Sequence, residues 1–201
     1  MRIKMKRLNN KGFSLLQVLT ATTVLGIVSA TLMASIFEKA QFKAMSKTKT
    51  GIAAARSNLQ NVMMHNVSWY YTIYDPVNEA QNPEIACVRG TAAAFNVNCH
   101  NATGTLRVLD ASQNVFYNTF SATQGFDKDG LICNNFDAGN GNFNCPLRAI
   151  VTWSANCTSD PCYNPSDIIV EVKFEYKTSD SDRKIAFNPA NYNFAFSSST
   201  P

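Results

Sequence analysis

The stretch Lys11-Gly12-Phe13-Ser14-Leu15-Leu16-Gln17 leads into a run of 25 residues, from Phe13 to Phe37, that carry no formal charge. At about 1.5 Å of rise per residue, a helix of this length can cross a bilayer core of ~30 Å. A lone span must be helical, because lipid offers no partners to backbone polar groups, and its Thr and Ser hydroxyls can bond to carbonyls of the preceding turn. The sequence therefore predicts one membrane-spanning helix over residues 13–37.

The charges around this run predict which side of the membrane each end faces. Five basic residues precede Gly12 with no acid to offset them, namely Arg2, Lys4, Lys6, Arg7 and Lys11. By the positive-inside rule these residues stay cytoplasmic, so the segment after residue 37 lies on the other side. Without them the chain has 13 basic and 14 acidic residues, a net charge of −1 instead of +4. A nucleic-acid-binding domain would gather basic residues on its soluble part, so we expect no nucleic-acid partner.

An ordinary secretory signal peptide also joins a basic start to an apolar middle, but it differs in length and in the place of cleavage. Its apolar region is ~7–15 residues long, and it is cut beyond that region. Here the apolar run is longer, and Gly12 stands between the basic segment and the run. A peptidase at the cytoplasmic membrane face could cut at this glycine and leave the whole helix on the product.

This arrangement, Lys11-Gly12 before an apolar Phe13, then Ser14-Leu15-Leu16 and later Gly26, resembles the class III signal of type IV prepilins and pseudopilins. The resemblance covers residues 1 to about 40. It implies that a prepilin peptidase removes residues 1–12 by cutting after Gly12, and that the new N-terminal amine of Phe13 is methylated. It also implies that other pilin or pseudopilin subunits and an inner-membrane assembly platform are partners.

One position departs from the family pattern. Gln17 stands where family members usually carry a glutamate, which the resemblance implies meets the terminal amine of a neighbouring subunit. An amide offers only a neutral acceptor, so the amine would keep an uncompensated charge at low dielectric. The tip pseudopilin of type II secretion also lacks this acid. We therefore expect a low-copy subunit that is located at the filament tip or initiates assembly.

All six cysteines lie in the part expected to be exported. They are Cys87, Cys99, Cys133, Cys145, Cys157 and Cys162. An even number on the oxidising side of a membrane predicts disulfides, and the absence of a C-x-x-C pair argues against a zinc or redox motif. Six cysteines allow fifteen pairings. Because short loops close at the least entropic cost, we favour the sequential pairs Cys87–Cys99, Cys133–Cys145 and Cys157–Cys162.

The helix is expected to continue beyond the apolar run, since no proline precedes Pro76. Apolar residues recur at three- and four-residue spacing at Ile52, Ala55, Leu59, Val62, Met63 and Val67. This spacing predicts an amphipathic continuation over residues 38–67, whose apolar face packs on a domain. Gly51 lies within it, costs about 1 kcal/mol relative to Ala, and is interpreted as a flexible point between anchor and domain. The turn Tyr74-Asp75-Pro76 should follow the helix.

Residues 68–201 predict one globular domain. In residues 168–177 apolar and charged side chains alternate, which indicates a strand with one buried face. Residues 147–153 predict a second strand, joined to the first as an antiparallel hairpin through the loop that holds Cys157 and Cys162. A sheet with one apolar face needs a cover, and the stripe on the long helix is the available partner.

The remaining segments of this domain give weaker signals. Residues 106–108 and 115–117 flank a polar turn and predict a hairpin. Residues 76–101 predict a connecting loop with a short helix, and Tyr192, Phe194 and Phe196 alternate as in an edge strand. The predicted fold class is α+β, a long N-terminal helix packed on a small antiparallel β-sheet and stapled by disulfides, which the pilin resemblance also implies.

No set of residues for catalysis is evident, so we expect no enzyme. His65 and His100 could act as bases at neutral pH, but neither comes with the companions of a triad or a metal site. The sequons at Asn66, Asn101 and Asn156 matter only in a host with the modifying enzyme.

Asp127-Lys128-Asp129-Gly130, with Asp137 farther on, resembles the start of a calcium loop. An EF-hand would need a glutamate where Ala138 stands. A calcium loop of another kind, which some pseudopilins use, remains one interpretation. A tight turn stabilised by aspartate side chains is the other.

Two functions remain open. The first is a structural subunit, a minor pilin or pseudopilin of a type IV pilus or type II secretion filament. It would be a single-pass inner-membrane protein with a periplasmic C-terminal domain before assembly. The second is an adhesin-like binding module for which the span is only an anchor.

Overall fold

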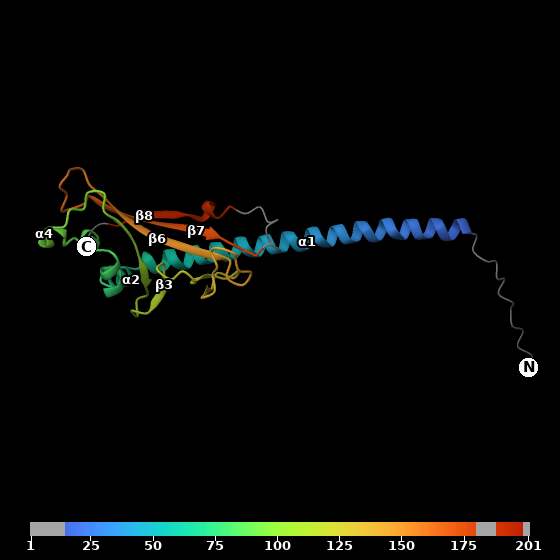
Figure 1. The fold of residues 1–201 in the computed structure, drawn as a ribbon, viewed down its shortest axis with the longest axis horizontal. Helices are drawn as coiled ribbons and strands as arrows, with labels where there is room; N and C mark the ends of the chain where they lie inside the picture. The colour runs from blue at the N-terminus through green and yellow to red at the C-terminus, as the bar shows by residue number, and fades with distance from the viewer. Residues whose placement is uncertain (1–14, 180–187, 199–201) are drawn as a thin grey trace, which may run out of the picture. The chain divides into compact units, whose positions relative to one another are not determined.

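The computed structural model describes residues 15–179 and 188–198. The chain divides into two units, Met1–Ala44 and Met45–Pro201, and helix α1 (Leu15–Met63) passes from one to the other (Figure 1). By length and composition α1 could cross a membrane. As expected of such a helix, the Thr22 hydroxyl donates to Val18 O at 3.1 Å and the Thr31 hydroxyl to Ile27 O at 3.1 Å. The predicted long N-terminal helix is thus confirmed.

The second unit contains two antiparallel sheets. The larger has the order β5-β4-β6-β7-β8, with β1 also paired to β6, and the smaller joins β2 to β3 (Figure 1). The strands are β1 (Thr103–Thr105), β2 (Arg107–Leu109), β3 (Val115–Asn118), β4 (Gly125–Phe126), β5 (Ile132–Cys133), β6 (Leu147–Asn156), β7 (Asp167–Tyr176) and β8 (Phe194–Ser198). The α+β class is confirmed.

The β6–β7 hairpin is the centre of the larger sheet. Its antiparallel register runs from Leu147 opposite Tyr176 to Asn156 opposite Asp167. Every second side chain is buried over residues 147–153 and over residues 168–174. This is the alternation that the sequence predicted, and β6 extends three residues beyond its predicted end at Trp153.

The second half of α1 covers the apolar face of this sheet. Ile52, Ala55, Leu59 and Met63 are each at most 2% exposed and share one core cluster with Trp153 of β6. Full burial of such aliphatic side chains contributes about 1.5–3 kcal/mol each. The predicted packing of the helix stripe on the sheet is confirmed.

The predicted continuation of the helix to Val67 is wrong. Helix α1 ends at Met63, and a separate helix α2 (Asn66–Ile73) follows a turn in which His65 N donates to Val62 O at 3.3 Å. Val67 is 44% exposed. It leaves the stripe because α2 buries Ser68, Thr72 and Ile73 instead.

Three short helices occupy the connection that the sequence predicted to hold one. They are α3 (Pro76–Gln81), η1 (Ile85–Cys87) and α4 (Ala92–Phe95). Asp75 is the N-cap of α3, and Pro76 occupies its first turn. Near the C-terminus η3 (Pro189–Tyr192) precedes β8, so Tyr192 belongs to a 3₁₀ turn and not to the predicted strand.

Gly51 is not a flexible point, because its backbone lies against another segment. A Cβ at Gly51 would lie 2.2 Å from Lys128 O, and a Cβ at Gly130 would lie 2.6 Å from Gly51 O. Gly130 also has φ = +80°, a conformation that glycine adopts without strain. The two glycines allow the turn at residues 127–131 to sit directly on α1.

The six cysteines form the three sequential pairs that the sequence favoured, Cys87–Cys99, Cys133–Cys145 and Cys157–Cys162. The first two join residues 12 positions apart, and the third joins residues 5 positions apart. Loop-closure entropy thus ranked the pairings correctly.

Candidate assembly and interaction surfaces

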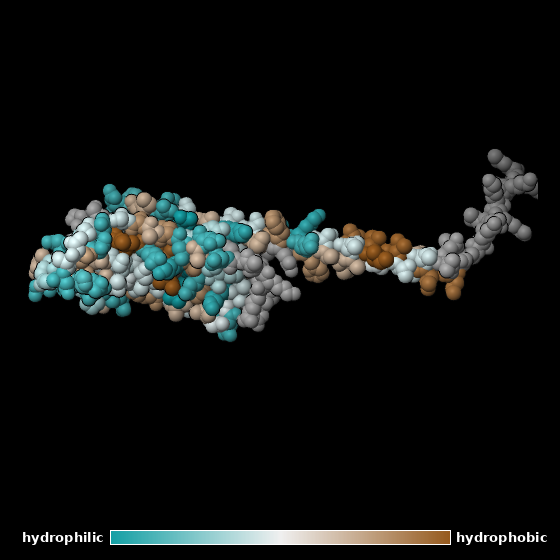
Figure 2. Space-filling view, turned by 90° about the horizontal axis from the view of Figure 1, so that it is seen from above, coloured by the Kyte–Doolittle hydropathy of each residue, from teal (hydrophilic) through white to brown (hydrophobic). Residues whose placement is uncertain are grey.

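The N-terminal part of α1 exposes a long apolar surface. Figure 2 shows brown, hydrophobic side chains along the helix. The large apolar side chains that are at least half exposed there are Leu15, Val18, Leu19, Val24, Leu25, Ile27, Val28, Leu32, Met33, Ile36 and Phe37. No described residue of this stretch carries a charge. Such a surface is suited to lipid or to other apolar helices.

The sequence assigns processing to Gly12 and Phe13 and assembly to Gln17. Gly12 and Phe13, the expected cleavage and methylation positions, are outside the described residues. Gln17 lies in the first turns of α1, and its side chain is outside the described part. The roles of these three residues stay predictions.

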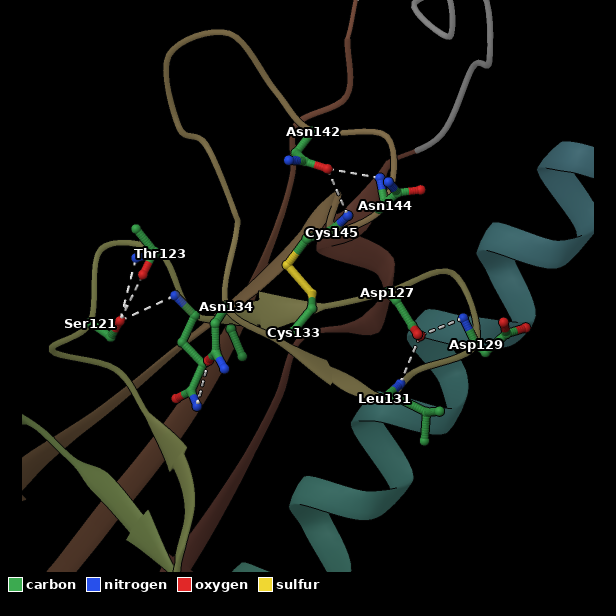
Figure 3. The surroundings of a disulfide bond; sticks show 12 residues. Ser121, Thr123, Asp127, Asp129, Leu131, Cys133, Asn134, Asn142, Asn144 and Cys145 are labelled. Carbon is green, nitrogen blue, oxygen red and sulfur yellow. Dashed lines mark hydrogen bonds between the residues drawn. A yellow bond between two sulfur atoms is a disulfide. The ribbon is translucent and has the colours of Figure 1, made fainter.

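The aspartates of the calcium-like motif form a turn that docks on α1 (Figure 3). Asp127 Oδ1 accepts from Asp129 N at 2.8 Å and from Leu131 N at 2.9 Å. Asp129 Oδ2 lies 3.0 Å from Lys47 Nζ of α1. The carboxylates hold the turn closed and tie it to the helix, as the aspartate-turn interpretation predicts, and the calcium interpretation stays a prediction.

Asp137 stabilises a different loop. Its Oδ1 accepts from Gly139 N at 2.8 Å and from Asn140 N at 3.0 Å. The hydrogen bond from Asn140 N, and then that from Gly139 N, lower the pKa of this carboxyl below its usual value. Within residues 15–179 and 188–198, no three His, Cys, Asp or Glu side chains gather in one place.

Two asparagines of the α3 region form paired hydrogen bonds with the backbone at the end of β1 and the start of β2, as a neighbouring strand would. Asn78 Nδ2 donates to Arg107 O at 2.7 Å, and Arg107 N donates to Asn78 Oδ1 at 2.7 Å. Asn82 makes the same two bonds with Thr105, at 2.8 and 3.0 Å. Both amides are at most 5% exposed. We call this arrangement of Asn78 and Asn82 on residues 105 and 107 the amide ladder.

The ladder is reinforced on both sides. Asp75 Oδ2 accepts from Arg107 Nε at 2.8 Å, and its side chain is only 2% exposed. Leu109 N donates to the Thr72 hydroxyl at 3.0 Å. Sequence reasoning missed this set, because the i and i+4 spacing of Asn78 and Asn82 in a loop-like composition gives no hint of the strand they meet.

Helix α2 buries two polar side chains beside Ile73 and exposes a tyrosine. It buries Ser68 and Thr72, which are 3% and 1% exposed, while Tyr70 is 52% exposed. Tyr74, just after the helix, is 40% exposed, and its ring lies 4.6 Å from that of Tyr70 between centroids. The Arg89 guanidinium lies 4.9 Å from the Tyr74 ring centroid. Tyr70 and Tyr74 form an exposed aromatic surface that the sequence alone did not indicate, and Arg89, whose side chain is 11% exposed, supports it from beneath.

The two histidines that the sequence singled out lie on the surface. His65 and His100 are both exposed, and His100 N donates to Asn98 Oδ1 at 3.0 Å. A groove of about 440 Å³ on the sheet is lined by Thr103, Thr152, Trp153, Ser154, Ile169, Glu171 and Ala195. Its acid, Glu171, lies 2.9 Å from Lys173. Its lining mixes polar and apolar side chains.

Two surfaces of this molecule are therefore unusual, the exposed apolar helix and the aromatic surface beside α2. Searches of family models, of curated proteins and of solved structures found no match to this chain. The geometry of these surfaces and the sequence before α1 carry the functional argument.

Proposed function

We propose that this chain is a structural subunit, a minor pilin or pseudopilin, of a type IV pilus or type II secretion filament. One observation carries the proposal. A helix with an exposed, uncharged N-terminal part directly follows the Lys11-Gly12-Phe13 motif and continues into the core of a disulfide-stapled domain. A helix with these two halves can be held first by lipid and then by the apolar helices of other subunits.

The energetics favour such an environment for α1. Each large aliphatic side chain left in water forgoes about 1.5–3 kcal/mol of burial free energy. Leu19, Leu25 and Ile27 are each more than 60% exposed. In lipid the hydroxyls of the helix still have partners, because Thr23 and Ser35 donate to carbonyls of their own helix. Both a bilayer and a bundle of like helices would remove this surface from water.

The proposal includes the following route. The precursor inserts with residues 1–12 in the cytoplasm and the domain in the periplasm, as the positive-inside rule requires. Prepilin peptidase cuts after Gly12, the amine of Phe13 is methylated, and an inner-membrane assembly platform moves the subunit into the filament.

The experiment that tests this proposal compares two glycines. Gly12→Val should block processing, so that intact mass shows residues 1–12 retained, while the unaltered chain begins at Phe13. Gly26→Val is the matched control, because a Cβ at Gly26 meets nothing within 4 Å. A mature chain that still begins at Met1, or that is cut beyond residue 37, would refute the proposal.

A second candidate function, the anchored adhesin-like module, is favoured by the aromatic surface. Exposed tyrosines beside an arginine are typical of binding surfaces. Tyr70→Ser with Tyr74→Ser should then abolish surface adhesion while leaving processing intact. If adhesion persists in this variant while Gly12→Val abolishes processing, only the filament function stands.

A further inference from the structure

Helix α1 carries two exposed lysines just beyond the end of its uncharged run. Lys39 and Lys43 are four residues apart and so lie on one face of the helix. Phe42, which is 69% exposed, lies beside them on the same side. Glu38 is the only acid between residues 13 and 74. This short segment is therefore net positive and keeps one large apolar ring.

The two lysines are not used by the rest of the structure. Among the described residues, the ion pair formed by this part of α1 belongs to Lys47, whose Nζ lies 3.0 Å from Asp129 Oδ2. Elsewhere in the described residues, ion pairs join Arg89 to Glu79, Arg107 to Asp75 and Lys173 to Glu171. Lys39 and Lys43 keep their ammonium groups for an external anion.

Lys39 lies within the depth of the lipid headgroups, and Lys43 lies just beyond it. At about 1.5 Å per residue, Lys39 lies ~3 Å and Lys43 ~9 Å along the helix beyond Phe37. The headgroup layer on each side of a bilayer is ~5–7 Å thick. Lysine side chains there can extend their ammonium groups to phosphates while their stems stay on apolar surface.

We propose that Lys39 and Lys43, with Phe42 beside them, form a binding site for anionic phospholipids in the outer leaflet of the membrane that α1 crosses. The ligand is the phosphate of an acidic headgroup such as phosphatidylglycerol, chosen by charge complementarity. Each lysine near a membrane surface should raise the local preference for anionic lipid roughly fivefold. The membrane orientation in this inference rests on the proposed function.

Processing would change which side of the span carries more basic side chains. The precursor has five basic residues on the cytoplasmic side of the span, all within residues 1–12. Cleavage after Gly12 would remove all five. Lys39 and Lys43 would then be the basic side chains closest to the span.

Photo-crosslinking from within the site tests this inference. The basic residues 1–12 do not interfere, because they lie on the opposite side of the membrane. Phe42→p-benzoylphenylalanine is placed in the full chain, which is reconstituted in vesicles of phosphatidylcholine and phosphatidylglycerol at a ratio of three to one. After irradiation, mass spectrometry counts the lipid adducts. Phosphatidylglycerol adducts should exceed their share of the vesicle several-fold, and 1 M salt should reduce the excess.

Charge variants show whether the lysine pair is responsible. Lys39→Gln with Lys43→Gln should return the adduct ratio to that of the vesicle. Lys49→Gln with Lys177→Gln removes the same charge from two other exposed sites and should leave the excess unchanged. Adducts at the vesicle ratio in the unaltered chain, or equal loss in both variants, would overturn the inference. Failure of the chain to float with the vesicles would overturn the membrane assignment in the proposed function as well.

Discussion

Gly51 and Gly130 illustrate how single residues determine the contact between α1 and the turn at residues 127–131. Gly51→Ala should lower the free energy of unfolding by about 1–3 kcal/mol, because the added methyl overlaps the Lys128 carbonyl. This loss would outweigh the ~1 kcal/mol gain in helix propensity. Urea unfolding of the detergent-solubilised chain, followed by the fluorescence of Trp69 and Trp153, measures it.

The control for this prediction is Gly26→Ala. It makes the same chemical change in the same helix, where a Cβ meets no atom within 4 Å. Its stability should equal or exceed that of the unaltered chain. If Gly51→Ala were as stable as Gly26→Ala, the close contact at Gly51 would not exist in solution.

We predict that the free energy of unfolding falls at alkaline pH because of Tyr117. Burial raises its pKa to about 12, against an ordinary value of 10.0. The folded state therefore holds this proton more tightly than the unfolded state does, and the resulting stability is complete below pH 10 and is lost as pH rises toward 12. The expected slope in that window is about 1.4 kcal/mol per pH unit.

Tyr117→Phe isolates this contribution. The variant should be less stable at neutral pH by about 1–3 kcal/mol, since Ala149 N donates to the Tyr117 hydroxyl at 2.9 Å and would lose its acceptor. Its stability should fall less between pH 10 and pH 12 than that of the unaltered chain. Tyr70→Phe, at an exposed tyrosine, should keep the full alkaline loss in the same urea titrations.

At the scale of elements, the amide ladder should contribute more to the free energy of unfolding than its size suggests. Asn78→Ala leaves the backbone N–H and C=O of Arg107 without partners, and each buried unpaired group costs about 1–3 kcal/mol. We expect a loss of roughly 2–4 kcal/mol on this basis. Asn61→Ala, at an exposed site on α1, should change stability by less than about 0.5 kcal/mol. Equal chemical-denaturation midpoints for the two variants would contradict the prediction.

The disulfides should differ in the stability they contribute. The loop-entropy model assigns about 3 kcal/mol to a loop the size of Cys87–Cys99 and about 2 kcal/mol to one the size of Cys157–Cys162. Cys87 and Cys99 are also fully buried, so their replacement disturbs the core. The Cys87→Ser, Cys99→Ser pair should therefore unfold at lower urea than the Cys157→Ser, Cys162→Ser pair. The reverse order would show that strain or unfolded-state structure governs these bonds.

Elements with a single strong cause could be predicted from the sequence. The alternation in β6 and β7, the short cysteine spacings and the apolar stripe of α1 each follow from one local rule. The end of α1 at Met63 could not be predicted, because helix propensity stays favourable through residue 67 and tertiary packing decides. The amide ladder and the contact of Gly51 with residue 128 depend on segments that are distant in sequence, so no local sequence pattern predicts them.

At the scale of the whole molecule, we predict from Gln17 that the chain is rare in a filament. We expect a trace amount relative to the principal subunit, because an amide cannot neutralise the amine of a neighbouring subunit. Gln17→Glu should raise incorporation, whereas Gln41→Glu, the same change beyond the apolar run, should not. Quantitative mass spectrometry of sheared filaments measures both. Near-stoichiometric abundance of the unaltered chain would contradict a tip or initiating position.

The amide ladder also bears on how copies of this chain coexist at high density. A bare strand edge is a template on which the strand of another molecule can add, and sheets that propagate in this way form aggregates. Asn78 and Asn82 fill the hydrogen-bonding positions of residues 105 and 107 with side chains from a helical segment, whose own backbone continues no sheet. The strand of another molecule therefore cannot pair with these backbone positions.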